Sequence, residues 1–148
     1  MKALILILTF NGLMLCGFAQ IGPSGSKLTA AQAAYTKGRY QEALNRLADA
    51  ERLQKQTTAP VLYLKILVQR ALLPAVNDSA FYNHMEQFDK LEVLRENCRL
   101  YLSNPVPAKI SFAAYQKISQ VRQSLTHYPV AKVQFDEIMH LKNTGKQH

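Results

Sequence analysis

The side chains of this sequence whose spacing suits metal chemistry are Glu137 and His140, which form an E-x-x-H pair. Residues three positions apart lie on one face of a helix, and such pairs supply half of a carboxylate di-iron site. The sequence contains no second E-x-x-H pair and no H-E-x-x-H zinc signature. We therefore expect Glu137 and His140 to face solvent, and we predict no metal ion and no cofactor.

Cys98 is the residue that could act as a nucleophile, provided that it were exposed and close to a histidine. His84 lies on the same expected helix, about 21 Å away at the helical rise per residue, which is too far for a base. His127 and His140 could approach Cys98 only through folding. Because Cys98 falls on the apolar stripe of its helix, we expect a buried thiol. The sequence also lacks a G-x-S-x-G motif and a phosphate loop, so we predict no catalytic residues and no enzyme activity.

The first 19 residues have the pattern of an export signal, with Lys2 followed by an apolar run and small residues before Gln20. Cleavage after Ala19 would leave 148 − 19 = 129 residues, the size of one domain. We expect a periplasmic or secreted protein. Two alternatives remain open. The run could stay as an uncleaved anchor, or Cys16, which ends a Leu-Met-Leu-Cys sequence similar to a bacterial lipobox, could be lipidated and tether the chain to the membrane.

The chain carries 18 Lys and Arg against 10 Asp and Glu, a formal net charge of +8 that falls to +7 without Lys2. Such an excess raises the question of a nucleic-acid partner. The basic residues are scattered, however, and are not interleaved with aromatic residues, so we expect solvated helix faces and no nucleic-acid binding. Attraction to acidic glycans, anionic lipid or an acidic partner is the alternative.

The N-terminal part of the mature chain is expected to become helical at Thr29. Residues 20–28 are rich in Gly, Pro and Ser, which predicts a flexible segment. Thr29 and Gln32 have the spacing of a capping box. We therefore expect the first helix to run from Thr29 to the turn at Gly38.

Residues 33–50 predict two helices joined by a tight turn. Gly38 can take the positive φ that ends a helix, because it has no Cβ to clash. The second helix is expected over residues 40–54, with one apolar stripe formed by Tyr40, Ala43, Leu44, Leu47 and Ala50.

This hairpin resembles a tetratricopeptide repeat (TPR), which carries a Gly, an aromatic residue two positions later, an Ala after three more and another Ala after seven more. Those positions are Gly38, Tyr40, Ala43 and Ala50 here, and the resemblance covers about residues 29–54. It implies a helical scaffold that binds proteins or peptides, and it does not name the ligand.

Four further helices are expected from apolar periodicity and from helix breakers, over residues 60–73, 79–102, 108–126 and 129–142. The first of them is apolar around most of its circumference, which predicts a central position. Asn77 or Asp78 can cap the second. The last is expected to turn Val130, Val133, Ile138 and Leu141 inward.

Together these patterns predict an all-α fold with about six helices in three antiparallel pairs, arranged as a TPR-like short solenoid or a compact helical bundle. Residues 29–142 form the expected single helical domain, and residues 143–148 a disordered tail.

A solenoid of helix pairs exposes the first helix of each pair on its concave face. Gln32 and Tyr35 on the first helix, and Lys65 and Gln69 on the third, are therefore the candidate partner-binding residues. The alternative is that they are ordinary polar side chains of packed helices. We expect an exported, non-enzymatic TPR-like module that binds a protein or peptide in the cell envelope. The alternative function is a membrane-tethered lipoprotein that serves as a structural accessory subunit, with membrane contact only through a lipidated Cys16.

Overall fold

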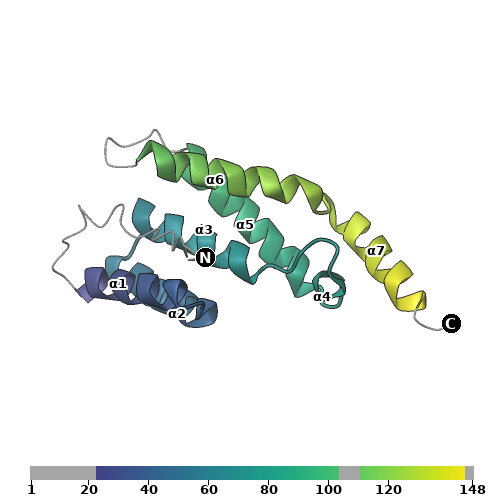
Figure 1. Ribbon diagram of the computed structural model, residues 1–148, viewed down its shortest axis with the longest axis horizontal. Helices are drawn as coiled ribbons and strands as arrows, with labels where there is room; N and C mark the ends of the chain where they lie inside the picture. The colour runs from purple at the N-terminus through teal and green to yellow at the C-terminus, as the bar shows by residue number, and fades with distance from the viewer. Residues whose placement is uncertain (1–22, 104–110, 146–148) are drawn as a thin grey trace, which may run out of the picture.

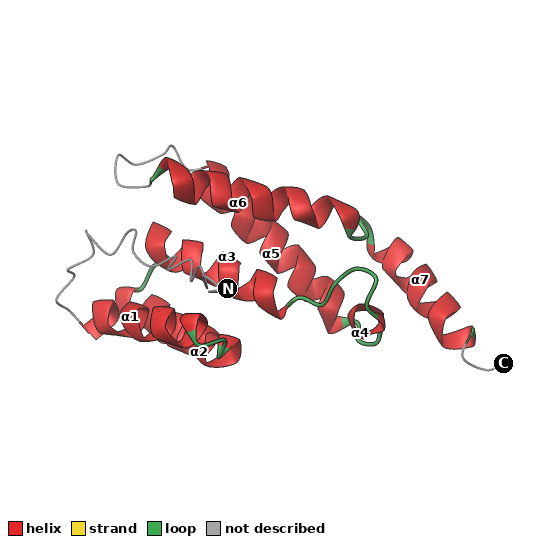
Figure 2. Ribbon diagram, in the orientation of Figure 1, coloured by secondary structure: helices red, strands yellow, loops and turns green. Residues whose placement is uncertain are grey.

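The computed structural model describes residues 23–103 and 111–145, and these residues are helical apart from short connections (Figures 1 and 2). The elements in chain order are α1 (Pro23–Thr36), α2 (Tyr40–Gln54), α3 (Ala59–Leu72), α4 (Ser79–Tyr82), α5 (Glu86–Ser103), α6 (Phe112–Ser124), the 3-10 helix η1 (Leu125–His127) and α7 (Lys132–Thr144). No strand occurs in the described ranges. The predicted all-α fold with packed neighbouring helices is confirmed.

The turn between α1 and α2 has the predicted glycine geometry. Gly38 has a φ of +72°, and its N–H donates to the carbonyl oxygen of Tyr35 at 2.9 Å. The N–H of Arg39 donates to the carbonyl of Ala34, also at 2.9 Å. These two bonds form a Schellman motif, which satisfies carbonyl groups at the end of α1. The chain can therefore reverse at once into α2, whose bounds are those predicted.

The start of α1 differs from the prediction, because the helix begins at Pro23 and not at Thr29. Proline is well tolerated in a first turn, where its missing N–H has no helical partner. Leu28 packs against the core, and Lys27 forms an ion pair with Asp49 of α2 at 3.3 Å, so tertiary contacts hold the added turns. Thr29 thus lies inside the helix, where its hydroxyl donates to the carbonyl of Gly25, and no capping box forms there.

Two apolar clusters build the core, and α3 contributes to both. The N-terminal cluster contains buried residues of α1, α2 and α3: Ala31, Ala34, Ala43, Leu47, Ala50, Val61, Leu64 and Val68. The opposite face of α3 supplies Leu62 and Ile66 to the larger C-terminal cluster, together with residues of α4 to α7. The predicted central position of this helix is therefore confirmed.

The expected single helix over residues 79–102 is wrong, because the helix is interrupted at residues 83–85, between α4 and α5. Asp78 caps α4 by accepting from the N–H of Ala80 at 2.9 Å, as expected. Phe81 and Tyr82 are consecutive yet both buried, and both rings lie 5.4 Å from the ring of Phe135 on α7. Both rings belong to α4, which packs against α7. The interruption after α4 allows this short helix to pack against α7 in a direction different from that of α5.

The C-terminal helices also start later than expected. Residues 108–110 lie outside the described ranges, and α6 begins at Phe112 after Ser111, whose hydroxyl accepts from the N–H of Ala114 at 3.2 Å. The last helix, α7, starts at Lys132 and not at Pro129. It packs against α4 and continues beyond α6 along one edge of the molecule (Figure 1).

The inward face assigned to the last helix is wrong for most of its residues. Val130, Val133 and Leu141 are 74%, 60% and 68% exposed, and only Ile138 is partly buried. Phe135 is fully buried in their place. The aromatic cluster around Phe81 sets the rotation of α7, and that cluster depends on residues far away in the sequence.

Candidate functional site

The first helices of successive pairs lie next to one another, as a solenoid requires. α1 contacts α3, and α3 contacts α6. α2 packs against α1 and α3, and α5 packs against α3 and α6. We call the surface of α1, α3 and α6 the first-helix face. It carries the candidate residues Gln32, Tyr35, Lys65 and Gln69, and the structure assigns these four side chains different environments.

Gln32 and Tyr35 lie on α1, with Gln32 exposed and Tyr35 half-buried. The ring of Tyr35 is tilted against that of Tyr40 on α2, with centroids 5.7 Å apart. Burial raises the pKa of the Tyr35 hydroxyl, and the nearby Tyr40 raises it further. Tyr35 is therefore neutral and presents a phenol, which can donate a hydrogen bond to a ligand.

Tyr63 of α3 extends this aromatic surface, and the sequence patterns did not identify it. Burial raises the pKa of Tyr63, with a further contribution from Tyr35, which places the two phenols in one electrostatic environment. On its other side the ring of Tyr63 lies 6.0 Å from that of Tyr101 on α5. We call Tyr35, Tyr40, Tyr63 and Tyr101 the tyrosine row. The signal in the sequence that could have identified Tyr63 is its position as the one aromatic residue among the apolar residues of this helix.

Lys65 is engaged within the molecule. Its Nζ lies 2.9 and 3.0 Å from the two carboxylate oxygens of Glu51 on α2. The side chains of Lys65 and Glu51 are only 27% and 20% exposed. This ion pair joins α3 to α2, so a ligand would have to compete with Glu51 for the ammonium group.

Gln69 is engaged in a similar way on the other flank of α3. Its Oε1 accepts a hydrogen bond from Nδ2 of Asn97 on α5 at 2.8 Å. Lys65 and Gln69 therefore point toward different neighbouring helices. The hydroxyl of Tyr35 contributes to the raised pKa of Tyr63, and Gln32 is the freely exposed member of the four candidates.

Cys98 is fully buried in the C-terminal cluster, as predicted. Burial raises the pKa of its thiol to about 11, and the opposing effect of Arg122 is smaller. Thiolate is the nucleophilic form of cysteine. Cys98 is therefore an inert packing residue at neutral pH.

Glu137 and His140 are both exposed on α7. Within the described ranges, no three His, Cys, Asp or Glu side chains come together in a group that could hold a metal ion. Cys16 lies outside the described residues. No helix within those ranges is both long and apolar enough to cross a bilayer.

An open hollow with a volume of about 430 Å³ lies between α4, η1 and α7, and Tyr82, His127, Tyr128, Pro129, Gln134, Glu137 and Ile138 line it. Nearby, the Lys142 ammonium lies 4.4 Å from the ring centroid of Tyr82. Of the titratable residues that line the hollow, His127 and Glu137 are exposed to water, whereas Tyr82 and Tyr128 are buried. The hollow offers a contact surface more than an enclosed reaction site.

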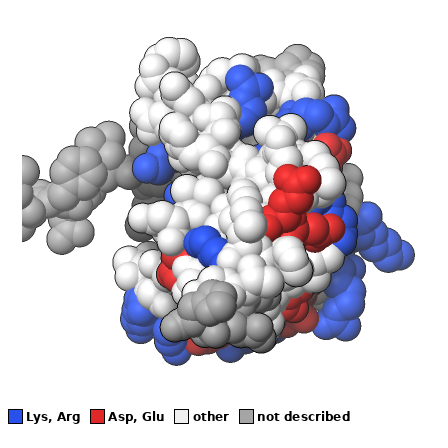
Figure 3. All heavy atoms as spheres, turned by 90° about the vertical axis from the view of Figure 1, so that its right-hand side faces the viewer, with Lys and Arg blue, Asp and Glu red and all other residues white. Residues whose placement is uncertain are grey.

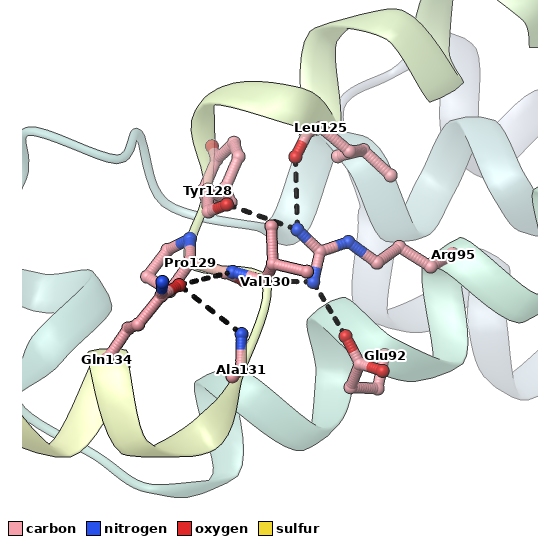
Figure 4. A network of polar contacts seen from close by, with 8 residues as sticks. All are labelled: Glu92, Arg95, Leu125, Tyr128, Pro129, Val130, Ala131 and Gln134. Carbon is pink, nitrogen blue, oxygen red and sulfur yellow. Dashed lines mark hydrogen bonds and ion pairs between the residues drawn. The ribbon is translucent and has the colours of Figure 1, made fainter.

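The linker between η1 and α7 is held by Arg95 of α5, another residue that the sequence patterns missed (Figure 4). Its guanidinium donates to the carbonyl oxygens of Leu125, Tyr128 and Pro129 at 3.1, 3.2 and 2.9 Å. It also pairs with Glu92 at 2.7 Å. These contacts fix the side of the hollow formed by the linker.

No protein-family model, no curated protein and no solved structure matches this chain.

Proposed function

We propose that this protein is an exported, non-enzymatic, TPR-like module that binds a protein or peptide partner in the cell envelope. The observation that supports the proposal is the order of the helices, in which α1 and α6 both contact α3. The glycine-ended hairpin of α1 and α2 supports it.

The tyrosine row supplies the chemistry that such binding needs. Tyrosine rings provide large contact areas at a low cost in conformational entropy, and their hydroxyls orient hydrogen-bonded ligands. Tyr35 and Tyr63 are half-buried, so their rings are held in place while part of each remains accessible. An extended peptide or a partner helix laid across α1 and α3 would contact both.

Site-specific photo-cross-linking in cells tests this proposal. A photoreactive amino acid at Gln32, which is exposed on α1, is expected to capture a discrete partner, and Tyr35→Ala in the same chain is expected to reduce its yield. The matched control is the photoreactive amino acid at Ala48, which is exposed on α2. Equal products from both positions, or no product from Gln32, would contradict binding on the first-helix face.

Export and anchoring are tested separately. Mass spectrometry of the mature N-terminus is expected to find a chain that begins at Gln20. A diacylated Cys16 at the N-terminus would support the alternative proposal, a lipoprotein that acts as a structural accessory subunit at the membrane.

A further inference from the structure

The acidic and basic residues of this chain are divided between two sets of helices. The helices of the first-helix face, α1, α3 and α6, contain no Asp or Glu. All acidic residues of the sequence lie on α2, α5 and α7, except Asp78, which caps α4. Figure 3 shows acidic side chains on the end of the molecule formed by α4 and α7. The charged residues that α1, α3 and α6 contribute are therefore all positive.

The basic residues of α1, α3 and α6 differ in whether a carboxylate neutralises them. Lys27 and Lys65 are each paired with a carboxylate of α2. Arg70, Lys117 and Arg122 have no carboxylate partner among the residues that the structure describes. Complementary charge on a partner speeds its association and selects it over other partners. Positive side chains without a carboxylate on a binding face therefore favour an acidic partner.

Arg70 is half-buried at the C-terminal end of α3, where two neighbours hold its guanidinium in place. Its Nε donates to Oγ of Ser124 on α6 at 3.3 Å, and its Cζ lies 5.9 Å from the ring centroid of Tyr128. Neither Nη atom has a hydrogen-bond partner within the described part of the chain. A guanidinium presents its N–H groups in a planar fork that matches a carboxylate. Arg70 is therefore positioned to bind a carboxylate of a partner.

Helical spacing assigns five residues to one surface of α3 and α6, which we call the basic surface. On α3, Tyr63 and Leu67 precede Arg70 by seven and three residues, so all three share one face of the helix. On α6, Lys117 precedes Ser124 by seven residues and shares its side of the helix. This side borders α3, because Ser124 contacts Arg70. Since α3 and α6 run in the same direction (Figure 1), Lys117 lies toward the Tyr63 end of α3.

We propose that the partner of the first-helix face is an acidic peptide segment, whose side-chain carboxylates bind Arg70 and Lys117 on the basic surface. This inference rests on the proposed binding function and specifies its partner. Two helical turns separate the levels of Lys117 and Arg70, about 10 Å at the helical rise per residue. An extended peptide covers that distance in about three residues. The segment therefore carries two acidic residues about three positions apart, with an apolar side chain between them that contacts Tyr63 or Leu67.

A nucleic acid fits this surface less well than a peptide does. Nucleic-acid binding draws its affinity from contacts to many phosphates. The basic surface offers two cations beside an aromatic ring, since Arg122 lies elsewhere on α6. Two carboxylates of a short peptide match that number.

Fluorescence anisotropy at low ionic strength tests the proposal with the full chain. The probe is a labelled peptide of Glu and Tyr with an amidated C-terminus, so that its carboxylates are all on side chains. The reference peptide has Gln in place of each Glu. We expect the acidic peptide to bind and the reference peptide not to bind. Arg70→Gln is expected to weaken binding about tenfold, the effect of losing a charge-assisted hydrogen bond. Lys117→Gln is expected to weaken it about threefold, because an exposed ion pair contributes less.

The matched control is Arg122→Gln, which removes the same charge from α6. Arg122 lies five residues after Lys117, about 140° around the helix, and its charge acts on the buried thiol of Cys98 on α5. This variant should bind the acidic peptide as the wild-type chain does. Arg70→Lys keeps the charge without the planar fork, and should lose less than Arg70→Gln. Circular dichroism and melting temperature report whether each variant is folded. Lys117 is exposed, so its variant tests the surface even where Arg70→Gln is destabilised.

Equal binding of the two peptides, or equal losses in Lys117→Gln and Arg122→Gln, would overturn the acidic partner. So would tighter binding of a single-stranded oligonucleotide than of the acidic peptide, which would indicate a phosphate ligand.

Photo-cross-linking at Gln32 separates this inference from the proposed function. A partner captured there in equal yield with and without Arg70→Gln would overturn the role of Arg70, while the binding module stands. Absence of any product at Gln32 would contradict the proposed function itself, whichever peptide binds.

Discussion

The guanidinium of Arg95 on α5 lies 2.9 Å from the carbonyl oxygen of Pro129, to which it donates a hydrogen bond. One side chain thereby fixes the path of the chain between η1 and α7 (Figure 4). The bond joins residues 34 positions apart, and the carbonyls of Leu125 and Tyr128 share the same donor group.

Arg95→Met is expected to lower the free energy of unfolding by about 2 kcal/mol, because three carbonyl groups lose a charged donor. Amide hydrogen exchange should accelerate most in α7. The matched control is Arg99→Met on the same helix. Arg99 is exposed and pairs with Glu96 alone, so its loss should cost less than about 0.5 kcal/mol. Equal effects of the two substitutions would contradict the role assigned to Arg95.

A double-mutant cycle on Lys65 and Glu51 should give a coupling free energy of about 1 kcal/mol, because both side chains are largely shielded from water. The cycle combines Lys65→Met and Glu51→Gln with urea unfolding. Lys90 and Glu86 are the control pair. They are 56% and 65% exposed on one helix, and should couple by only about 0.3–0.5 kcal/mol. Coupling no larger than in the control would show that Lys65 is free to serve a ligand.

Gly38→Ala is expected to destabilise the fold by about 1–2 kcal/mol through the backbone alone. The φ of Gly38 is +72°, yet a Cβ there would meet no atom within 4 Å. Gly38→Asn should lose less, since asparagine tolerates the left-handed region better than alanine. Equal losses for the two variants in thermal unfolding would contradict a conformational cause.

Cys98 gives a prediction for alkaline pH. Burial raises the pKa of its thiol from the usual 9.0 to about 11. Below pH 9 the thiol is neutral in both the folded and the unfolded chain. Between pH 9 and about pH 11 it ionises only in the unfolded chain, so the free energy of unfolding should fall as the pH rises.

Cys98→Ala should flatten this fall when urea unfolding of the two chains is compared across that pH range. The other alkaline groups are common to both chains, so their difference isolates the thiol. Identical pH profiles would contradict the raised pKa.

The helices that could be predicted from the sequence are those with local signals. Gly38 ends α1 because only its own backbone is involved, and Pro60 fits the first turn of α3 because no helical hydrogen bond needs its N–H there. The apolar circumference of α3 likewise predicted a central helix. These features depend on residues close together in the chain.

The features that could not be predicted depend on distant partners. Phe81 and Met85 continue a helical stripe into α5, yet Phe81 packs against Phe135 across the molecule and the helix breaks. Similarly, the sequence alone is compatible with a solvated Lys65, whereas in the structure Lys65 pairs with Glu51 of α2. Among the candidate binding residues, periodicity placed Gln32 and Tyr35 on one helix, but it could not reveal the electrostatic influence of Tyr35 on Tyr63 of α3.

Helix α3 belongs to both core clusters, since Val68 faces one and Ile66 the other. Unfolding of either half therefore exposes one face of α3 to water and lowers the stability of the half that remains folded. The two halves are thermodynamically coupled for this reason. A ligand that binds only the folded form of α3 stabilises the whole chain by mass action. Occupation of the tyrosine row would in this way be transmitted to α7 without any displacement of the backbone.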